Sequence, residues 1–341
     1  MRLKDIGEFG FIRRIRDVGK IRCEGVVKGI GDDCAVIDIN GPDYLLVTTD
    51  LLMERVHFRR DWGTSEQLGG KALAVNLSDI AACGGIPRDA FVSLAIPDDI
   101  ELAWLDGFYR GMSRMAQAYD VNILGGDTTG SKRDLVINIT LTGVVPREQV
   151  LFRHTARPGD LIALTGRTGV SAAGCEILLS GRDPKDETAQ ELILHHLEPR
   201  PHVQEGRFLA ESGVCTAAID VSDGLSSDLT HICEESRLGA IIFERLIPID
   251  QALLTFANCV GSGALRWVLH GGEDYVLLVA LEEQSVSALS PQAESQGITL
   301  TVIGQFREQP GIELVRADGR GEPLYPRGWD HFRSIIPEGS R

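Results

Sequence analysis

Short β-branched segments and helical segments alternate along nearly the whole chain, and this alternation constrains the fold more than any other feature. Residues 44–49 form an apolar, β-branched run that predicts a strand. Residues 70–84 and 101–119 carry apolar side chains at helical spacing, and Leu102 begins the apolar stripe of the second helix. Strict alternation over residues 135–145 predicts another strand, buried on one face. The sequence therefore predicts a mixed α/β or α+β protein.

A cluster of proline, glycine and charged residues at 146–160 interrupts the alternation and predicts a domain boundary. A new strand is expected at residues 161–165, followed by a glycine turn and a helix from Ser171. We therefore divide the chain into domains 1–148 and 149–341. A length of 341 residues fits two domains of about 150 residues each, which can bury cores without disulfide or metal support.

Charge and cysteine content exclude several classes of protein. The chain has 49 acidic and 34 basic residues, for a net charge of −15, which argues against a nucleic-acid partner or an anionic membrane surface. Its seven cysteines are odd in number and lack Cys-x-x-Cys spacing, so a zinc ribbon or disulfide framework is not expected and a reducing cytoplasmic location fits best. No apolar run approaches the ~18 residues that a membrane span needs.

Carboxylates recur at turns where a predicted strand ends or glycines turn the chain. Six segments share this pattern: 29–33, 48–50, 76–79, 125–129, 219–224 and 271–274. One such turn is explained as a turn or a helix cap, but six are harder to explain in that way, and Asp79 lies inside a helical pattern. Converging carboxylates repel, so they must hold cations such as Mg²⁺ or Ca²⁺. Mg²⁺ usually binds with phosphates and the calcium-loop motif is missing, so the pattern favours phosphate chemistry.

The common nucleotide-binding motifs are absent. Walker A does not occur, the dinucleotide fingerprint breaks at Cys34, and no protein-kinase signature is present. A helix expected to open at Ser222, after a strand at residues 216–221, would offer backbone N–H groups to a phosphate. ATP binding, if present, therefore lies outside those families.

Taken together, the segments resemble the thiamine-monophosphate kinase family, in the superfamily of aminoimidazole ribonucleotide synthetase, selenophosphate synthetase and a hydrogenase-maturation dehydratase. The matching segments are Gly-Glu-Phe-Gly at 7–10, Gly-Ile-Gly-Asp-Asp-Cys-Ala at 29–35, Thr-Thr-Asp at 48–50, Lys-Ala-Leu-Ala-Val-Asn-Leu-Ser-Asp at 71–79, Gly-Gly-Asp-Thr-Thr at 125–129, Ala-Arg-Pro-Gly-Asp at 156–160, Ile-Asp-Val-Ser-Asp-Gly-Leu at 219–225, Gly-Gly-Glu-Asp-Tyr at 271–275 and Gly-Trp-Asp-His-Phe at 328–332. The chain departs from the family pattern at Gly70, at His154-Thr155 and at Val276, none of which is a proposed metal ligand.

The resemblance implies an ATP-dependent phosphorylation of thiamine monophosphate to thiamine diphosphate, the last step of thiamine diphosphate biosynthesis. It implies a two-domain aminoimidazole ribonucleotide synthetase-like fold. In that fold an N-terminal sheet domain dimerises, a C-terminal α/β domain follows, and the active site lies in the cleft between them. A homodimer is therefore expected, with Mg²⁺ and ATP as the required ion and co-substrate.

The resemblance also implies the residues of the site. It places several Mg²⁺ ions on Asp32, Thr48, Thr49, Asp50, Asp79, Asp127, Asp220 and Asp223. It places ATP against Tyr109, Gly126, Asp127, Arg153 and Ser222. It places the thiamine phosphate near His57, Glu273 and Trp329. No general acid or base is expected, because a phosphate acceptor is already largely dianionic at neutral pH.

Simpler interpretations and other functions stay open. Arg153 could form a surface ion pair, Trp329 could close the core, and Ser222 could be a plain helix cap. Another ATP-dependent synthetase of the superfamily, a non-catalytic nucleotide and metal sensor, and a metal-dependent phosphohydrolase are the alternative functions. A selenophosphate synthetase would need a reactive cysteine in a glycine-rich N-terminal loop, a setting that Cys23 and Cys34 lack.

Overall fold

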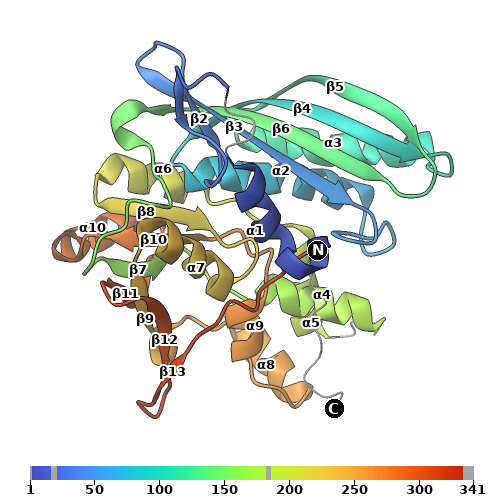
Figure 1. The fold of residues 1–341 in the computed structure, drawn as a ribbon. Coiled ribbons are helices and arrows are strands. Elements are labelled where there is room, and N and C mark those ends of the chain that lie inside the picture. The colour runs from blue at the N-terminus through green and yellow to red at the C-terminus, as the bar shows by residue number, and fades with distance from the viewer. Residues whose placement is uncertain (1, 17–20, 182–185, 333–341) are drawn as a thin grey trace.

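The computed structural model describes residues 2–16, 21–181 and 186–332, in which two mixed sheets lie one above the other (Figure 1). The N-terminal sheet has the order β1-β2-β3-β6-β4-β5, and β4 and β5 are its parallel pair. Its strands are β1 (Val26–Lys28), β2 (Ala35–Asp38), β3 (Asp43–Met53), β4 (Ile86–Pro97), β5 (Asn122–Ser131) and β6 (Val136–Pro146).

The C-terminal sheet has the order β13-β12-β9-β11-β7-β10-β8, and β12 and β9 are its parallel pair. Its strands are β7 (Leu161–Leu164), β8 (Cys215–Asp220), β9 (Gly239–Phe243), β10 (Leu277–Leu281), β11 (Thr301–Arg307), β12 (Gly311–Val315) and β13 (Gly321–Pro323). The helices of this half are α4 (Val170–Ser180), α5 (Glu187–Leu197), α6 (Val203–Ser212), α7 (Leu225–Ser236), α8 (Gln251–Cys259), α9 (Leu265–His270) and α10 (Glu283–Ser295). Each half thus combines helices with a sheet, which confirms the predicted mixed class.

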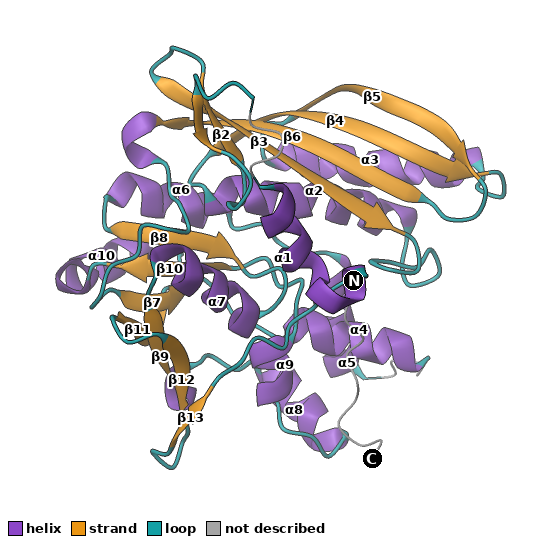
Figure 2. Ribbon diagram, in the orientation of Figure 1, coloured by secondary structure: helices purple, strands orange, loops and turns teal. Residues whose placement is uncertain are grey.

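One face of the N-terminal sheet is covered by α2 (Ser65–Ala82) and α3 (Leu102–Ala118), whereas no helix of the described chain lies over the other face (Figure 2). That open face exposes Leu51 of β3 and Phe91 of β4. Helix α1 (Leu3–Ile15) runs across the side of the molecule where the two halves meet (Figure 1). No helix in the described part of the chain is long and apolar enough to cross a membrane.

Helix α2 joins the two halves. The predicted stripe through Leu73, Leu77 and Ile80 is buried, but most of the remaining surface of α2 is buried too, because α2 also packs against α6 and β8. The hydrophobic core around α2 includes Ala218 of β8 and Val279 of β10. The proposed division near residue 148 falls in the short 3₁₀ helix η1 (Arg147–Gln149) and stays a prediction, because this core crosses it.

Most expected elements are present, and two details of the sequence prediction are wrong. Leu102 is 73% exposed, because it stands at the first position of α3, before the helix reaches α2. Helix α7 begins at Leu225 and not at Ser222. The chain between them turns through Gly224 at φ = 115°, a conformation that glycine adopts readily.

The crossing of α2 over α3 yields a stability prediction with an internal control. A Cβ built on Gly69 would lie 1.9 Å from the carbonyl oxygen of Phe108, whereas one on Gly70 would have 3.9 Å to its nearest neighbours. We expect Gly69→Ala to lower the free energy of unfolding by roughly 1–3 kcal/mol, as overpacked sites do. Gly70→Ala should leave it unchanged or raise it by up to ~1 kcal/mol through helix propensity. Thermal unfolding of both variants tests this, and equal melting temperatures would contradict it.

Candidate active site

The centre of the candidate site is a group of three carboxylates from three separate elements. Asp33 lies in the turn before β2, Asp79 lies on α2 and Asp220 ends β8, and one oxygen from each lies within 4.8 Å of the others. Thr48 of β3 donates a hydrogen bond to Asp79, and Ser78 donates one to Asp220 Oδ2 at 2.6 Å. The group therefore stands at the junction of the two halves of the chain.

Burial makes Asp79 and Asp220 of this group, and the nearby Asp50, retain protons. It raises the pKa of Asp220 to about 8, with the charge of Asp33 as the next cause. The same two causes raise the pKa of Asp50 to about 6. Burial, and then the charges of Asp50 and Asp220, raise the pKa of Asp79 well above its usual value. Neighbouring carboxylates that repel one another when ionised are stabilised by a bound cation. All the donors here are oxygens, which Mg²⁺ prefers, so the residues fit Mg²⁺.

Arg153 is the cation that the structure places beside this group. Its Nε lies 3.2 Å from Asp33 Oδ2, and its Nη2 donates a second hydrogen bond to Oδ1 of the same residue. Burial alone would lower the pKa of Arg153, but the charge and hydrogen bond of Asp33 outweigh burial and raise it. Arg153 is therefore a buried partner of the carboxylates, and the surface ion-pair interpretation is wrong.

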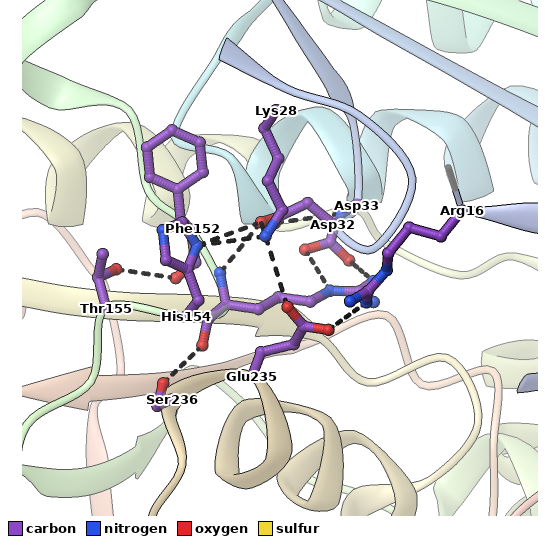
Figure 3. A network of polar contacts seen from close by, with 10 residues as sticks. Arg16, Lys28, Asp32, Asp33, Phe152, His154, Thr155, Glu235 and Ser236 are labelled. Carbon is purple, nitrogen blue, oxygen red and sulfur yellow. Dashed lines mark hydrogen bonds and ion pairs between the residues drawn. The ribbon is translucent and has the colours of Figure 1, made fainter. Parts of the chain in front are cut away.

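Asp32 and Asp33 are neighbours in sequence but take different partners (Figure 3). Lys28 Nζ lies 3.4 Å from Asp32 Oδ2 and 3.6 Å from Glu235, which also pairs with Arg16. Burial, followed by the charge of Asp33, raises the pKa of Asp32 to about 6. One oxygen of Asp32 still lies within 4.8 Å of one of Asp33, so Asp32 as a Mg²⁺ ligand stays a prediction.

The expected substrate residues surround the loop after β8. Glu273 donates its backbone N–H to Ser222 O at 2.7 Å, and Trp329 donates its own to Asp223 O at 3.0 Å. Trp329 is 44% exposed, which excludes the core-residue interpretation. Its indole nitrogen donates to His331 Nδ1 at 3.1 Å, and the ring of His331 lies 4.8 Å from that of His57. Two of the three expected thiamine-site residues are thus linked through His331.

Glu273 is held in a strained and charged position. Its backbone has φ = 63°, uncommon for a residue with a side chain. Lys71 Nζ lies 2.9 Å from Glu273 Oε2, and His196 Nδ1 lies 3.2 Å from the same oxygen. Burial raises the pKa of Glu273, but Lys71 and His196 outweigh burial, so the net pKa is lowered and the carboxylate stays ionised.

Comparison with known proteins now decides the family. The models for the N-terminal and C-terminal domains of AIR synthase related proteins match residues 31–145 and 157–316. The thiamine-monophosphate kinase of Escherichia coli K12 is 40% identical over 96% of this chain and 98% of its own length. That of Bacillus subtilis is 34% identical over 89% and 93%. The chain belongs to the thiamine-monophosphate kinase family.

Solved structures of the family agree with this fold. AaThiL complexed with AMPPCP and TMP has a TM-score of 0.85 at 32% identity and covers 97% of this chain and 99% of its own. The thiamine monophosphate kinase of Aquifex aeolicus gives a TM-score of 0.81 at 31% identity, with coverage of 96% and 100%. The predicted two-domain synthetase-like fold is therefore confirmed.

In this member of the thiamine-monophosphate kinase family, three expected ATP residues lie away from the carboxylate group. Tyr109, Gly126 and Asp127 line a hollow formed by α3, β4 and β5. Asp127 lies on β5 and Asp50 on β3, three strands apart in the sheet order, which corresponds to ~14 Å. Within one chain, Asp127 therefore cannot share an ion with Asp50. Thr49, another expected Mg²⁺ ligand, also lies away from the carboxylate group. Its hydroxyl accepts a hydrogen bond from Asn138 on the exposed face of the sheet.

Two acidic residues near the site accept hydrogen bonds from backbone N–H groups. Asp274 accepts hydrogen bonds from the N–H groups of Gly169 and Ser171 at the start of α4, and burial raises its pKa to about 7. Asp228 Oδ2 accepts the N–H groups of Asp223 and Gly224. The N–H groups that were expected to serve a phosphate beside Ser222 are thus partly used by the protein.

Asp33 and Lys71 lie in the sequence motifs but were assigned no role in the site, and Asp228 and His231 were not identified from the sequence. Asp33 is adjacent to the predicted Asp32, and both follow Gly31, whose φ of 113° sets the turn. Asp228 and His231 stand three residues apart on α7, a spacing that places side chains on one helix face. This three-residue spacing, directly after the turn at Asp220–Asp223, was the sequence signal from which Asp228 and His231 could have been identified.

The family departures leave the carboxylate group intact. His154 lies 3.3 Å from Lys28 Nζ through its Nδ1 and 4.0 Å from Asp32 Oδ2, at the edge of the polar network (Figure 3). Val276 is buried in the C-terminal core, next to the positive-φ residue Tyr275.

The raised pKa values predict how pH and Mg²⁺ act on stability. Asp50 and Asp220 bind protons more tightly folded than unfolded, where an aspartate has a pKa of ~3.9. Without divalent cations, stability is therefore lost as the pH rises from about 4 to about 8. Because Mg²⁺ competes with those protons, it should raise the melting temperature more at pH 8 than at pH 6.

Thermal unfolding in EDTA and in excess Mg²⁺, at both pH values, measures this effect. Asp220→Asn is the control, since the pKa of Asp220 is raised further than that of Asp50, and its removal should weaken the pH dependence. An equal Mg²⁺-induced shift at pH 6 and pH 8 would contradict the prediction.

Proposed function

We propose that this protein transfers the γ-phosphoryl group of ATP directly to thiamine monophosphate, giving thiamine diphosphate and ADP. The observation that carries the proposal is the buried group of Asp33, Asp79 and Asp220 beside Arg153, at the junction of the two halves. Its support is the family membership and the relative that was solved with AMPPCP and TMP. A site that must bring two polyanions together needs such a convergence of cation ligands.

The chain's own residues provide alignment and charge control. We assign Mg²⁺ to the carboxylate group, with Asp50 and the Thr48 hydroxyl beside it. The ions would neutralise the phosphate oxygens and align them. Arg153 is already charged, so it can pair with a phosphate once Asp33 exchanges its contact with Arg153 for a contact with a metal ion. Positioning and neutralisation suffice, because phosphoryl transfer to a dianionic phosphate needs no proton acceptor.

The residues near His57 form the acceptor side of the proposed site. Burial, and then the charge of His331, lower the pKa of His57, so it binds as a neutral ring. Lys71 keeps Glu273 ionised, and an ionised carboxylate suits the cationic rings of thiamine. Trp329 offers an exposed indole to the same rings.

A selenophosphate synthetase reaction is disfavoured by the cysteines. Cys34 is buried, and burial raises its pKa well above the usual thiol value, with the neighbouring Cys83 as the next cause. A thiol in that state is a poor nucleophile. Incubation with Mg-ATP and thiamine monophosphate separates the remaining functions. Thiamine diphosphate supports the kinase, ADP with free phosphate supports a phosphohydrolase, and no turnover supports a sensor.

We predict that Asp50→Asn lowers kcat more than about tenfold while the fold survives. The amide keeps the shape of the side chain but removes an anionic ligand, and the metal-free melting temperature should hold or rise because repulsion with Asp33 falls. Asp43→Asn, the same substitution at the start of the same strand, is the control and should retain activity. Activity of Asp50→Asn above a tenth of wild type would remove Asp50 from the metal site.

We further propose a homodimer that packs through the open face and edge of the N-terminal sheet. Edge strand β5 is exposed along most of its length, and Leu51, Phe91 and Leu124 are exposed large apolar residues on this sheet. A long exposed edge with apolar residues favours pairing with another chain. The distance of Asp127 from Asp50 supports the same arrangement, because a second copy can bring Asp127 to the site of the first.

Mixing two inactive variants tests whether the sites are shared between chains. After unfolding and refolding together, equal amounts of Asp50→Asn and Asp127→Asn should recover about a quarter of wild-type activity, since half of the dimers are hybrids with one intact site of two. If both residues served the same chain's site, the mixture would stay inactive. Sedimentation of each variant alone controls for loss of dimer.

Trp329 yields a prediction for substrate affinity. Cation–π attraction of ~0.5–2 kcal/mol corresponds to a KM for thiamine monophosphate that rises roughly 2- to 30-fold in Trp329→Ala. The KM for ATP and kcat should change little, because the contact exists equally before and during transfer. Trp329→Phe should recover most of the loss. An unselective rise in both Michaelis constants would assign Trp329 a structural role instead.

A further inference from the structure

A second cluster of potential metal ligands lies on and before α7. Asp223, Asp228 and His231 each offer one ligand atom, and these atoms lie within 4.8 Å of one another. This group differs from the Asp33 group in chemistry, because one of its donors is an imidazole nitrogen. The family resemblance assigns an ion to Asp223 and none to the other two residues.

His231 supplies a second observation at this cluster. Its Nε2 is buried and has no hydrogen-bond partner in the described part of the chain. A buried polar atom without a partner costs free energy, so native structures seldom leave one unless an ion or water completes it. The ring is held in place by Phe9 of α1, whose centroid lies 4.1 Å away.

Asp228 is fixed for the same purpose. Its Oδ2 accepts the backbone N–H groups of Asp223 and Gly224, which orients the Asp228 side chain against the turn that carries Asp223. One turn of α7 then carries His231 to the same face. The three donors are thus positioned by backbone and ring contacts that do not require the ion.

We propose that Asp223, Asp228 and His231 form a second divalent-cation site, which takes a first-row transition cation of the Mn²⁺ or Co²⁺ class in preference to Mg²⁺. Imidazole suits these cations, whereas Mg²⁺ binds oxygen donors almost exclusively. Two carboxylates and one neutral ring balance a double positive charge. The proposal concerns metal binding alone and stands or falls independently of the substrate.

Mn²⁺ is the probe, because its electron spin reports directly bound nitrogen. Metal-stripped protein is given about one equivalent of Mn²⁺ per chain in an excess of Mg²⁺, which fills the oxygen-only group. Electron spin echo modulation should then show coupling to a ¹⁴N nucleus in the wild-type protein. This measurement requires no variant, so it stays decisive if a substitution disturbs folding.

Two matched variants locate the nitrogen. His231→Phe keeps an aromatic ring against Phe9 but removes the donor, and it should abolish the ¹⁴N coupling and weaken Mn²⁺ binding by roughly tenfold or more. His154→Phe removes the histidine beside Asp32 and should leave both unchanged. Absence of ¹⁴N coupling in the wild type, coupling that persists in His231→Phe, or coupling lost in His154→Phe would each overturn the proposal. None of these measurements depends on the formation of thiamine diphosphate, so a failure of the proposed kinase activity would be a result distinct from a failure of this metal site.

Discussion

Carboxylates that share one buried site are stable only when positive charge lies among them, and the junction of this protein is built on that constraint. Asp33, Asp79 and Asp220 come from a turn, a helix and a strand end, and burial raises the pKa values of the latter two. Arg153 supplies part of the missing charge through Asp33. The remaining deficit makes the site a receptor for cations, and through them for phosphates.

Helix α2 links the carboxylate group to both halves of the fold. Asp79 and Ser78 lie near its C-terminal end, where they face β3 and β8, and Lys71 lies two turns earlier, where it pairs with Glu273. A helix that meets partners on several sides must be buried almost all round, as α2 is. Its glycines fit this setting, since Gly69 lets α3 approach within contact of the backbone. The placement of one helix thus positions the proposed metal ligands and the proposed substrate residue together.

The sequence predicted the elements well because strand and helix periodicity depends on local pattern. It predicted the site less completely, because an aspartate where a strand ends or glycines turn the chain shows the same kind of local pattern in three different roles. Asp220 joins the carboxylate group, Asp274 caps α4, and Asp127 lies on an exposed edge strand. Only the packing of distant segments separates these roles. The same reason explains why Asp33 was not assigned to the site beside Asp32, since its partner Arg153 lies far away in the chain, whereas Lys28 stands close to Asp32 in sequence.

Two of the cation–carboxylate pairs that cross between the halves of the chain connect ligand binding to the junction itself. The ion pair between Lys71 and Glu273 holds the Glu273 carboxylate on the proposed acceptor side before any substrate binds. Arg153 with Asp33 joins the halves at the other side, where phosphates would arrive. A phosphate that attracts Arg153 frees Asp33, and a free carboxylate strengthens the hold of the same group on a cation. In the proposed site, nucleotide and metal would therefore favour each other through one exchanged ion pair, and each would alter a contact that joins the two halves.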